Sequence, residues 1–223
     1  MKRILCFGDS NTWGLVAGTD NRYDWETRWT GRLQDALSGD GFQVVEEGLC
    51  GRTTVFDDVS RPGRSGAELL PVLLEAHAPL DLVILMLGTN DCKTVYDPTV
   101  SSISAGIDSL LGQIRKFSGD CEVLLLSPIE LGDEVWKEEF DPEFGKESVK
   151  VARALPSVYR ELSGKWDISY LAASDYAKPS AVDQEHLDAE GHRNLADAVS
   201  KKVFEIFSQN GGTEKKQGPE SGN

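Results

Sequence analysis

The sequence predicts an α/β fold, namely a flavodoxin-like, doubly wound sheet of five parallel strands in the order 2-1-3-4-5. Two observations support this fold class. Short apolar runs alternate along the chain with longer segments of helical periodicity, a pattern typical of a parallel sheet with helices on both faces. The run at residues 82–87 is continuously apolar, as expected of a central strand that is covered on both faces.

Each predicted strand is followed by a helix. Strands are expected at residues 3–7, 42–47, 81–87, 121–127 and 166–172. Helices are expected at 27–38, 65–78, 98–117, 146–164 and 188–207. In the first of these helices Trp29, Leu33 and Leu37 recur at helical spacing and define one apolar face. This order of elements gives residues 1–208 as one domain.

Two segments do not fit the alternation. Residues 209–223 contain no large apolar side chain, so we expect a disordered tail there. Residues 130–145 are acidic and aromatic without a clear period, and they are too long for a plain connection. We expect this loop to border the carboxyl edge of the sheet. There its aromatic side chains would cover a small-molecule substrate or contact a second copy of the chain in a homo-oligomer.

The composition excludes several classes of partner. The net charge of −14 disfavours nucleic acid and anionic membranes. No apolar run is long enough for a signal-peptide core or a membrane span. The four cysteines are far apart without a C-x-x-C pair, so we expect free thiols and a cytoplasmic location; they are Cys6, Cys50, Cys92 and Cys121.

Polar loops follow four of the five predicted strands. They read GDSNT at 8–12, GLCGRT at 48–53, GTND at 88–91 and DQEH at 183–186. In open parallel sheets ligands bind beyond the carboxyl ends of the strands, where the strand order reverses. Because strands one, two and three are neighbours in the predicted order, we expect their loops to lie close together.

These loops contain the parts of a serine hydrolase. A hydroxyl nucleophile needs a base, and the base needs an orienting group; Ser10, His186 and Asp183 supply one of each. An oxyanion hole needs donors, which the N–H groups of Gly51 and Ser10 and the side-chain amide of Asn90 offer. Taken alone, each of these residues is ordinary in a cap, a turn or a packed position. Only their joint occurrence in four loops favours catalysis.

The blocks FGDSNTWG, GLCGRTT, LGTND and DQEHLDAEGH resemble the SGNH branch of the GDSL esterase/lipase family, over nearly all of residues 2–207. The stretches KRILCFGDSNTWG, RWTGRL and MLGTND resemble its bacterial arylesterase/acyltransferase-type subgroup. The resemblance implies the SGNH hydrolase fold, with Ser10 as nucleophile, His186 as base and Asp183 as its orienting acid. Two departures are Asn11, where the name motif has Leu, and Cys50, where many members have Ser.

We therefore expect a serine esterase that acts on small aryl or short-chain acyl esters, without a metal or organic cofactor. An acyltransferase or an acetyl-sugar esterase with the same triad is the alternative, and a non-catalytic acyl- or carbohydrate-binding module is a further one. Asp9, Trp13 and Trp136 are the candidates for lining the substrate pocket. His77 and His192 are expected to be structural.

Overall fold

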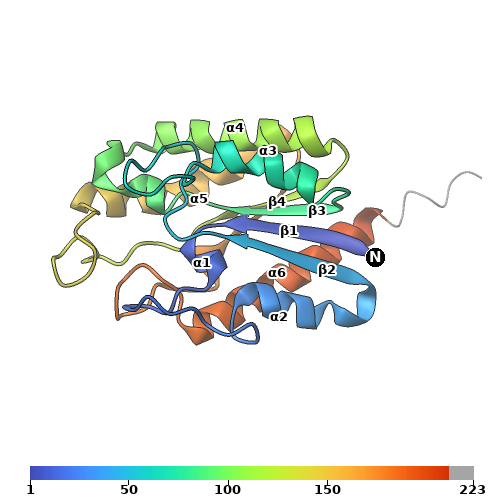
Figure 1. Ribbon diagram of the computed structural model, residues 1–223, viewed down its shortest axis with the longest axis horizontal. Helices are drawn as coiled ribbons and strands as arrows, with labels where there is room; N and C mark the ends of the chain where they lie inside the picture. The colour runs from blue at the N-terminus through green and yellow to red at the C-terminus, as the bar shows by residue number, and fades with distance from the viewer. Residues whose placement is uncertain (211–223) are drawn as a thin grey trace, which may run out of the picture.

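The computed structural model describes residues 1–210, with the backbone alone at 209 and 210, and confirms the predicted sheet. Its five strands are all parallel and lie in the order β2-β1-β3-β4-β5. Their bounds are β1 (Lys2–Gly8), β2 (Phe42–Gly48), β3 (Leu82–Met86), β4 (Glu122–Ser127) and β5 (Ser169–Ala172). The carboxyl ends of all five strands therefore meet at one edge, toward which the arrows point in Figure 1.

An α-helix follows each strand at the predicted place, and a further four-residue helix directly after β1 lies outside the predicted ranges. The α-helices are α1 (Ser10–Trp13), α2 (Trp29–Ala36), α3 (Gly66–Ala76), α4 (Val100–Ser118), α5 (Lys146–Trp166) and α6 (Ala189–Asn210). Short 3-10 helices lie in three of the connections: η1 (Ser38–Asp40) before β2, η2 (Asn90–Cys92) and η3 (Thr94–Tyr96) after β3, and η4 (Ala173–Asp175) after β5. Among residues 1–210, none of the helices is both long and apolar enough to cross a membrane.

Most predicted boundaries differ from the structure by one or two residues, and two larger differences have a physical reason or concern the tail. Residues 166–168 were expected in the fifth strand, but α5 continues to Trp166 and ends where Asp167 adopts a left-handed φ of 51°. The strand prediction was wrong there because Trp and Ile suit a strand as well as the end of an amphipathic helix. The predicted tail begins at 209, whereas α6 continues to Asn210. Residues 211–223 lie outside the described part of the chain.

Helices cover both faces of the sheet (Figure 1). Alternate residues of β1 face opposite ways: Leu5 and Phe7 pack with the core under α3, α4 and α5, and Ile4 and Cys6 pack with the core over α2 and α6. This period of two is the signature of a strand that is buried on both faces. The helices thus close both faces and leave the carboxyl edge to the loops.

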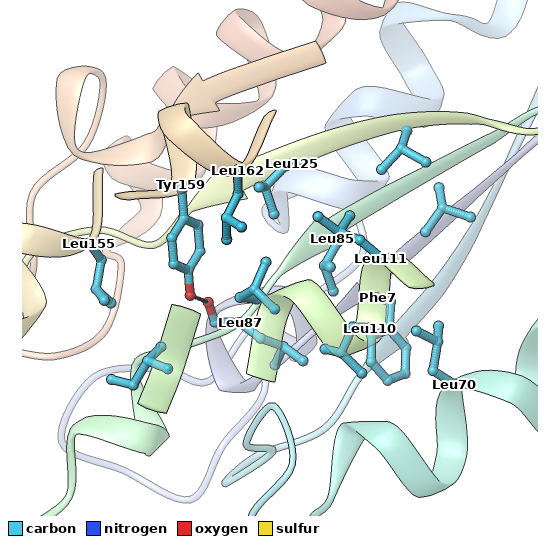
Figure 2. Close-up of a cluster of buried hydrophobic side chains, with 14 of the residues drawn as sticks. Phe7, Leu70, Leu85, Leu87, Leu110, Leu111, Leu125, Leu155, Tyr159 and Leu162 are labelled. Atoms are coloured by element: carbon cyan, nitrogen blue, oxygen red, sulfur yellow. Dashed lines mark hydrogen bonds between the residues drawn. The ribbon is translucent and has the colours of Figure 1, made fainter. Parts of the chain in front are cut away.

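Tyr159 of α5 connects the first of these cores to that edge. Its ring is fully buried, and its hydroxyl donates a hydrogen bond of 2.8 Å to the carbonyl of Leu87 (Figure 2). The next residue, Gly88, has a φ of +125°, and a Cβ there would lie 2.4 Å from the Tyr159 hydroxyl. Only glycine fits this position, so α5 fixes the backbone where the GTND loop begins.

We expect Tyr159→Phe to lower the free energy of unfolding by about 1–3 kcal/mol, because the buried Leu87 carbonyl loses its donor. Urea denaturation measures the change. Tyr176→Phe is the matched control, since Tyr176 is 48% exposed, and it should leave stability nearly unchanged. Equal stability of the Tyr159→Phe variant and the wild type would show that this hydrogen bond contributes nothing.

Candidate active site

The loops after β1, β2 and β3 and the loop before α6 meet around one cavity. This cavity has a volume of about 200 Å³, and its lining includes Ser10, Gly51, Asn90 and His186. These residues come from four separate parts of the chain, and the parallel sheet brings them to the same edge. Four predicted site residues therefore share one space.

A chain of hydrogen bonds runs from Asp183 through His186 to Ser10. The Ser10 hydroxyl lies 2.9 Å from Nε2 of His186, and Nδ1 of the same ring lies 2.8 Å from Oδ2 of Asp183. Asp183 also accepts the backbone N–H groups of Gly18, Glu185 and His186. The carboxylate is therefore held in one orientation, which in turn holds the imidazole toward Ser10.

The charges around His186 shift its titration. Burial alone lowers the pKa of His186, but the carboxylates of Glu185, Asp183 and Asp9 outweigh burial and raise it above the ordinary value of 6.5. Burial likewise disfavours the charged form of Asp183, yet the hydrogen bonds from His186 keep the Asp183 pKa below its ordinary value. The pair is thus set for an ionised Asp183 beside a basic imidazole.

Three hydrogen-bond donors belong to residues that line this cavity, namely Ser10, Gly51 and Asn90. The N–H groups of Ser10 and Gly51 donate to no acceptor within residues 1–210. Gly51 has a φ of +81°, and a Cβ there would lie 2.6 Å from the guanidinium of Arg61. The Asn90 side chain donates a 3.1 Å hydrogen bond to the carbonyl of Arg52, which leaves its second amide hydrogen free for a ligand. These groups have the composition of an oxyanion hole.

Of the three predicted pocket residues, none lines this cavity or the neighbouring one. Asp9 points inward and caps α1, its carboxylate accepting the N–H of Asn11, and burial raises the pKa of Asp9 to about 6. Trp13 stacks under the Arg22 guanidinium at 4.9 Å. Trp136 packs against the core of α4 and α5. The Trp13 indole thus contacts a cation and the Trp136 indole contacts the core. Both rings therefore have partners elsewhere in the protein and do not line the cavity.

The 130–145 segment borders the site through its acidic residues. Asp141 and Glu143 line the Ser10 cavity, and Glu139, Phe140 and Asp141 line the cavity next to it. The cation Lys93, from the GTND loop, pairs with Glu143 and so fastens this segment over the site. Lys93, Arg61 and Glu185 are cavity residues that the sequence did not single out. Their chemistry is ordinary for exposed loops, and only the folded chain turns them inward.

The chain matches the GDSL-like lipase/acylhydrolase family over residues 6–194. It belongs to this family. Its structure is similar to a carbohydrate acetylesterase from Sinorhizobium meliloti, Est24, with 35% identity, a TM-score of 0.85, and coverage of 92% of this chain and 100% of the other. An aryl esterase from M. smegmatis gives 34% identity, a TM-score of 0.85 and the same coverage. A comparison with curated proteins finds no match.

A putative arylesterase from Agrobacterium tumefaciens is also similar, with 35% identity, a TM-score of 0.83, and coverage of 92% and 100% of the two chains. The family and these neighbours identify the chain as a carboxylic ester hydrolase of the SGNH fold. The histidines other than His186 are structural in this GDSL hydrolase, as predicted. His77 pairs with Glu47 at 2.8 Å, and His192 is buried and accepts the N–H of Trp29.

The two departures from the family motifs now have a structural account. Cys50 lines the Ser10 cavity, where burial and the charge of Asp9 raise its pKa to about 11. It is therefore a protonated thiol at neutral pH, with little nucleophilic character. Asn11 bridges α1 and the DQEH loop. Its amide accepts the N–H of Leu187 at 2.9 Å and donates to the carbonyl of Glu185 at 3.4 Å, so it holds both residues that flank His186.

We expect Asn11→Ala to lower kcat about ten- to a hundredfold with a smaller change in KM, because the loop that carries His186 loses two hydrogen bonds and shifts. Steady-state kinetics on 4-nitrophenyl acetate measure this. Asn11→Asp is the matched variant: it still accepts from Leu187 but cannot donate to Glu185. The kcat of Asn11→Asp should lie between that of the wild type and that of Asn11→Ala. A folded Asn11→Ala protein with unchanged kcat would contradict the positioning role.

Proposed function

We propose that this protein is a serine esterase that hydrolyses short-chain acyl esters through an acyl-enzyme on Ser10. The observation that carries the proposal is the unbroken chain of hydrogen bonds from Asp183 through His186 to Ser10, at 2.8 and 2.9 Å. A nucleophile, a base in contact with it and an orienting carboxylate are what acyl transfer to a serine requires. The substrate and partner is thus a small-molecule ester.

In the first half of the reaction the Ser10 oxygen attacks the ester carbonyl as its proton moves to Nε2 of His186. The N–H groups of Ser10 and Gly51 and the Asn90 amide stabilise the negative oxygen of the tetrahedral intermediate. The C–O bond to the alcohol then breaks, and His186 returns the proton to the leaving oxygen. In the second half water attacks the acyl carbon and gives a proton to His186. The bond from the acyl carbon to the Ser10 oxygen then breaks, His186 returns that proton to the Ser10 oxygen, and the acid leaves.

The walls of the cavity favour small and polar esters. Its volume is about 200 Å³, and five of its lining residues carry charged side chains: Arg61, Lys93, Asp141, Glu143 and Glu185. A long alkyl chain would displace the hydration of these charges without apolar contacts in return. Two similar structures are named as an acetylesterase of carbohydrates and an aryl esterase. We therefore favour acetyl esters, including those of polar alcohols.

We expect Ser10→Ala to lower kcat on 4-nitrophenyl acetate by a factor on the order of 10⁶, because a nucleophile and its base act as one unit. Circular dichroism should show an unchanged fold. A fluorophosphonate should label the wild type at one site and leave the variant unlabelled. Retention of more than about a tenth of the wild-type turnover would remove Ser10 from the mechanism.

The pH profile should show a single rising limb with its midpoint above 6.5, the ordinary pKa of imidazole, and a plateau in mild alkali. His186 must be neutral to accept the Ser10 proton. Its carboxylate neighbours Glu185, Asp183 and Asp9 favour the charged ring, so more alkaline solution is needed to deprotonate it. kcat/KM from about pH 5 to 9 tests this.

Asp183→Asn is the companion variant for this profile. Its kcat/KM should be far below that of the wild type even on the alkaline plateau, because the amide holds the wrong imidazole tautomer toward Ser10. A flat wild-type profile, with acylation shown to limit the rate, would argue against His186 as the base. Equal plateau values of kcat/KM for the variant and the wild type would show that Asp183 does not orient His186 for catalysis.

A further inference from the structure

Glu185 is a buried acid in the site with no assigned task. It lines both cavities that adjoin His186 and is 5% exposed. Its backbone is fixed on both sides, since its N–H donates to Asp183 and its carbonyl accepts from Asn11. Within residues 1–210 no group donates a hydrogen bond to its carboxylate. Neither oxygen of this carboxylate belongs to the fully buried polar atoms that lack a partner, so both reach the cavity, where a ligand can supply the missing donor.

The carboxylate lies where the alcohol part of an ester must pass. Its Oε1 atom is 3.8 Å from Nε2 of His186. Nε2 returns a proton to the leaving oxygen, which must then lie at about 2.8 Å from this nitrogen. A polar group on the second carbon from that oxygen therefore comes within hydrogen-bonding reach of Glu185. The acyl group, by contrast, is held by Ser10 and the donors beside Gly51.

The surrounding charges decide which polar group fits. Lys93 is already paired with Glu143 and lies 4.0 Å from Asp141, and Arg61 is paired with Asp58 at 2.8 Å. Both cations that line this cavity therefore have carboxylate partners other than Glu185, which leaves its carboxyl for a group of the substrate. Burial, helped by Asp141 and Asp183, raises the pKa of Glu185 to about 7, while His186 and Lys93 lower it. Near neutral pH the carboxyl can thus accept or donate a hydrogen bond, as a hydroxyl requires.

We propose that Glu185 determines specificity for the alcohol by binding a hydroxyl on the carbon next to the ester-bearing carbon. The natural substrates are then monoesters of vicinal diols, such as partly acetylated polyols. This inference rests on the proposed esterase function and extends it to the leaving group. Glu185 acts on the substrate and takes no proton from Ser10.

A pair of esters of equal size tests the proposal. 2-Hydroxyethyl acetate and propyl acetate differ only in a hydroxyl replacing a methyl group. We expect the wild type to prefer the hydroxyl ester in kcat/KM by about tenfold or more, the factor that a charge-assisted hydrogen bond provides. Glu185→Leu should abolish the preference. Glu185→Gln, which keeps a neutral acceptor and donor, should retain part of it and serves as the test if the Leu variant does not fold.

Glu139→Gln is the matched control, because Glu139 is an exposed acid that lines the cavity next to the Ser10 cavity but not the Ser10 cavity itself. Its ratio of the two kcat/KM values should equal that of the wild type. An unchanged ratio in a folded Glu185→Leu or Glu185→Gln protein would overturn the proposal, as would a wild-type ratio near one. If the enzyme instead preferred acetylcholine to propyl acetate, with no preference for 2-hydroxyethyl acetate, and this preference depended on Glu185, Glu185 would be a cation site and the proposal would be overturned.

Failure of the esterase function itself has a different signature. The wild type would then hydrolyse none of the three esters, that is 2-hydroxyethyl acetate, propyl acetate and 4-nitrophenyl acetate. A fluorophosphonate would also fail to label Ser10. A labelled, active enzyme whose ratio does not depend on Glu185 refutes the inference alone.

Discussion

The buried guanidinium of Arg52 connects the parts from which the site is built. Its Nη1 atom donates to the carbonyls of Gly8, at 2.8 Å, and Glu47, at the ends of β1 and β2. Its plane lies 4.2 Å from the centre of the Phe7 ring, and its own carbonyl accepts the Asn90 amide from the loop after β3. Three neighbouring strand ends are thus connected through one residue, two by its side chain and the third by its backbone carbonyl. Burial lowers the Arg52 pKa to about 10, which still leaves it charged at neutral pH.

The fold was predictable because its signals are local and repeated. Each strand is an apolar run, each helix has its own period, and the order of elements leaves few topologies for a parallel sheet. The positions of Ser10, Gly51, Asn90 and His186 followed from the same topology, since each lies just beyond a strand end or before α6. Arg52 and Glu185 could not be found in this way, because their roles depend on contacts between loops. Trp13 shows the converse, since the sequence does not reveal that Arg22 occupies its ring.

The site concentrates buried acids that disfavour the folded state at neutral pH. Burial raises the pKa of Asp9 and of Asp91 to about 6. A carboxyl whose folded-state pKa is raised supports stability below its unfolded pKa, about 4, and this support is lost as the pH rises through about 6. Asp91 is kept in place by the N–H and hydroxyl of Thr54, which join the loops after β2 and β3. The burial of these acids thus lowers the stability of the fold at neutral pH, while their hydrogen bonds fix the arrangement of the loops.

The two sides of an ester would meet different parts of the chain. The carbonyl side would face Ser10, Gly51 and Asn90, whose backbones are fixed by strand ends, by Arg52 and by Tyr159 through Leu87. The alcohol side would face Glu185 and the acidic 139–143 stretch, which is held by the Lys93 ion pair and by hydrogen bonds from Thr94 to the Glu143 carbonyl rather than by a strand. A change on the first side disturbs the sheet and the proposed chemistry together. A change in the 139–143 stretch alters what surrounds the leaving group and leaves the geometry around Ser10 in place, whereas a change at Glu185 also shifts the pKa of His186.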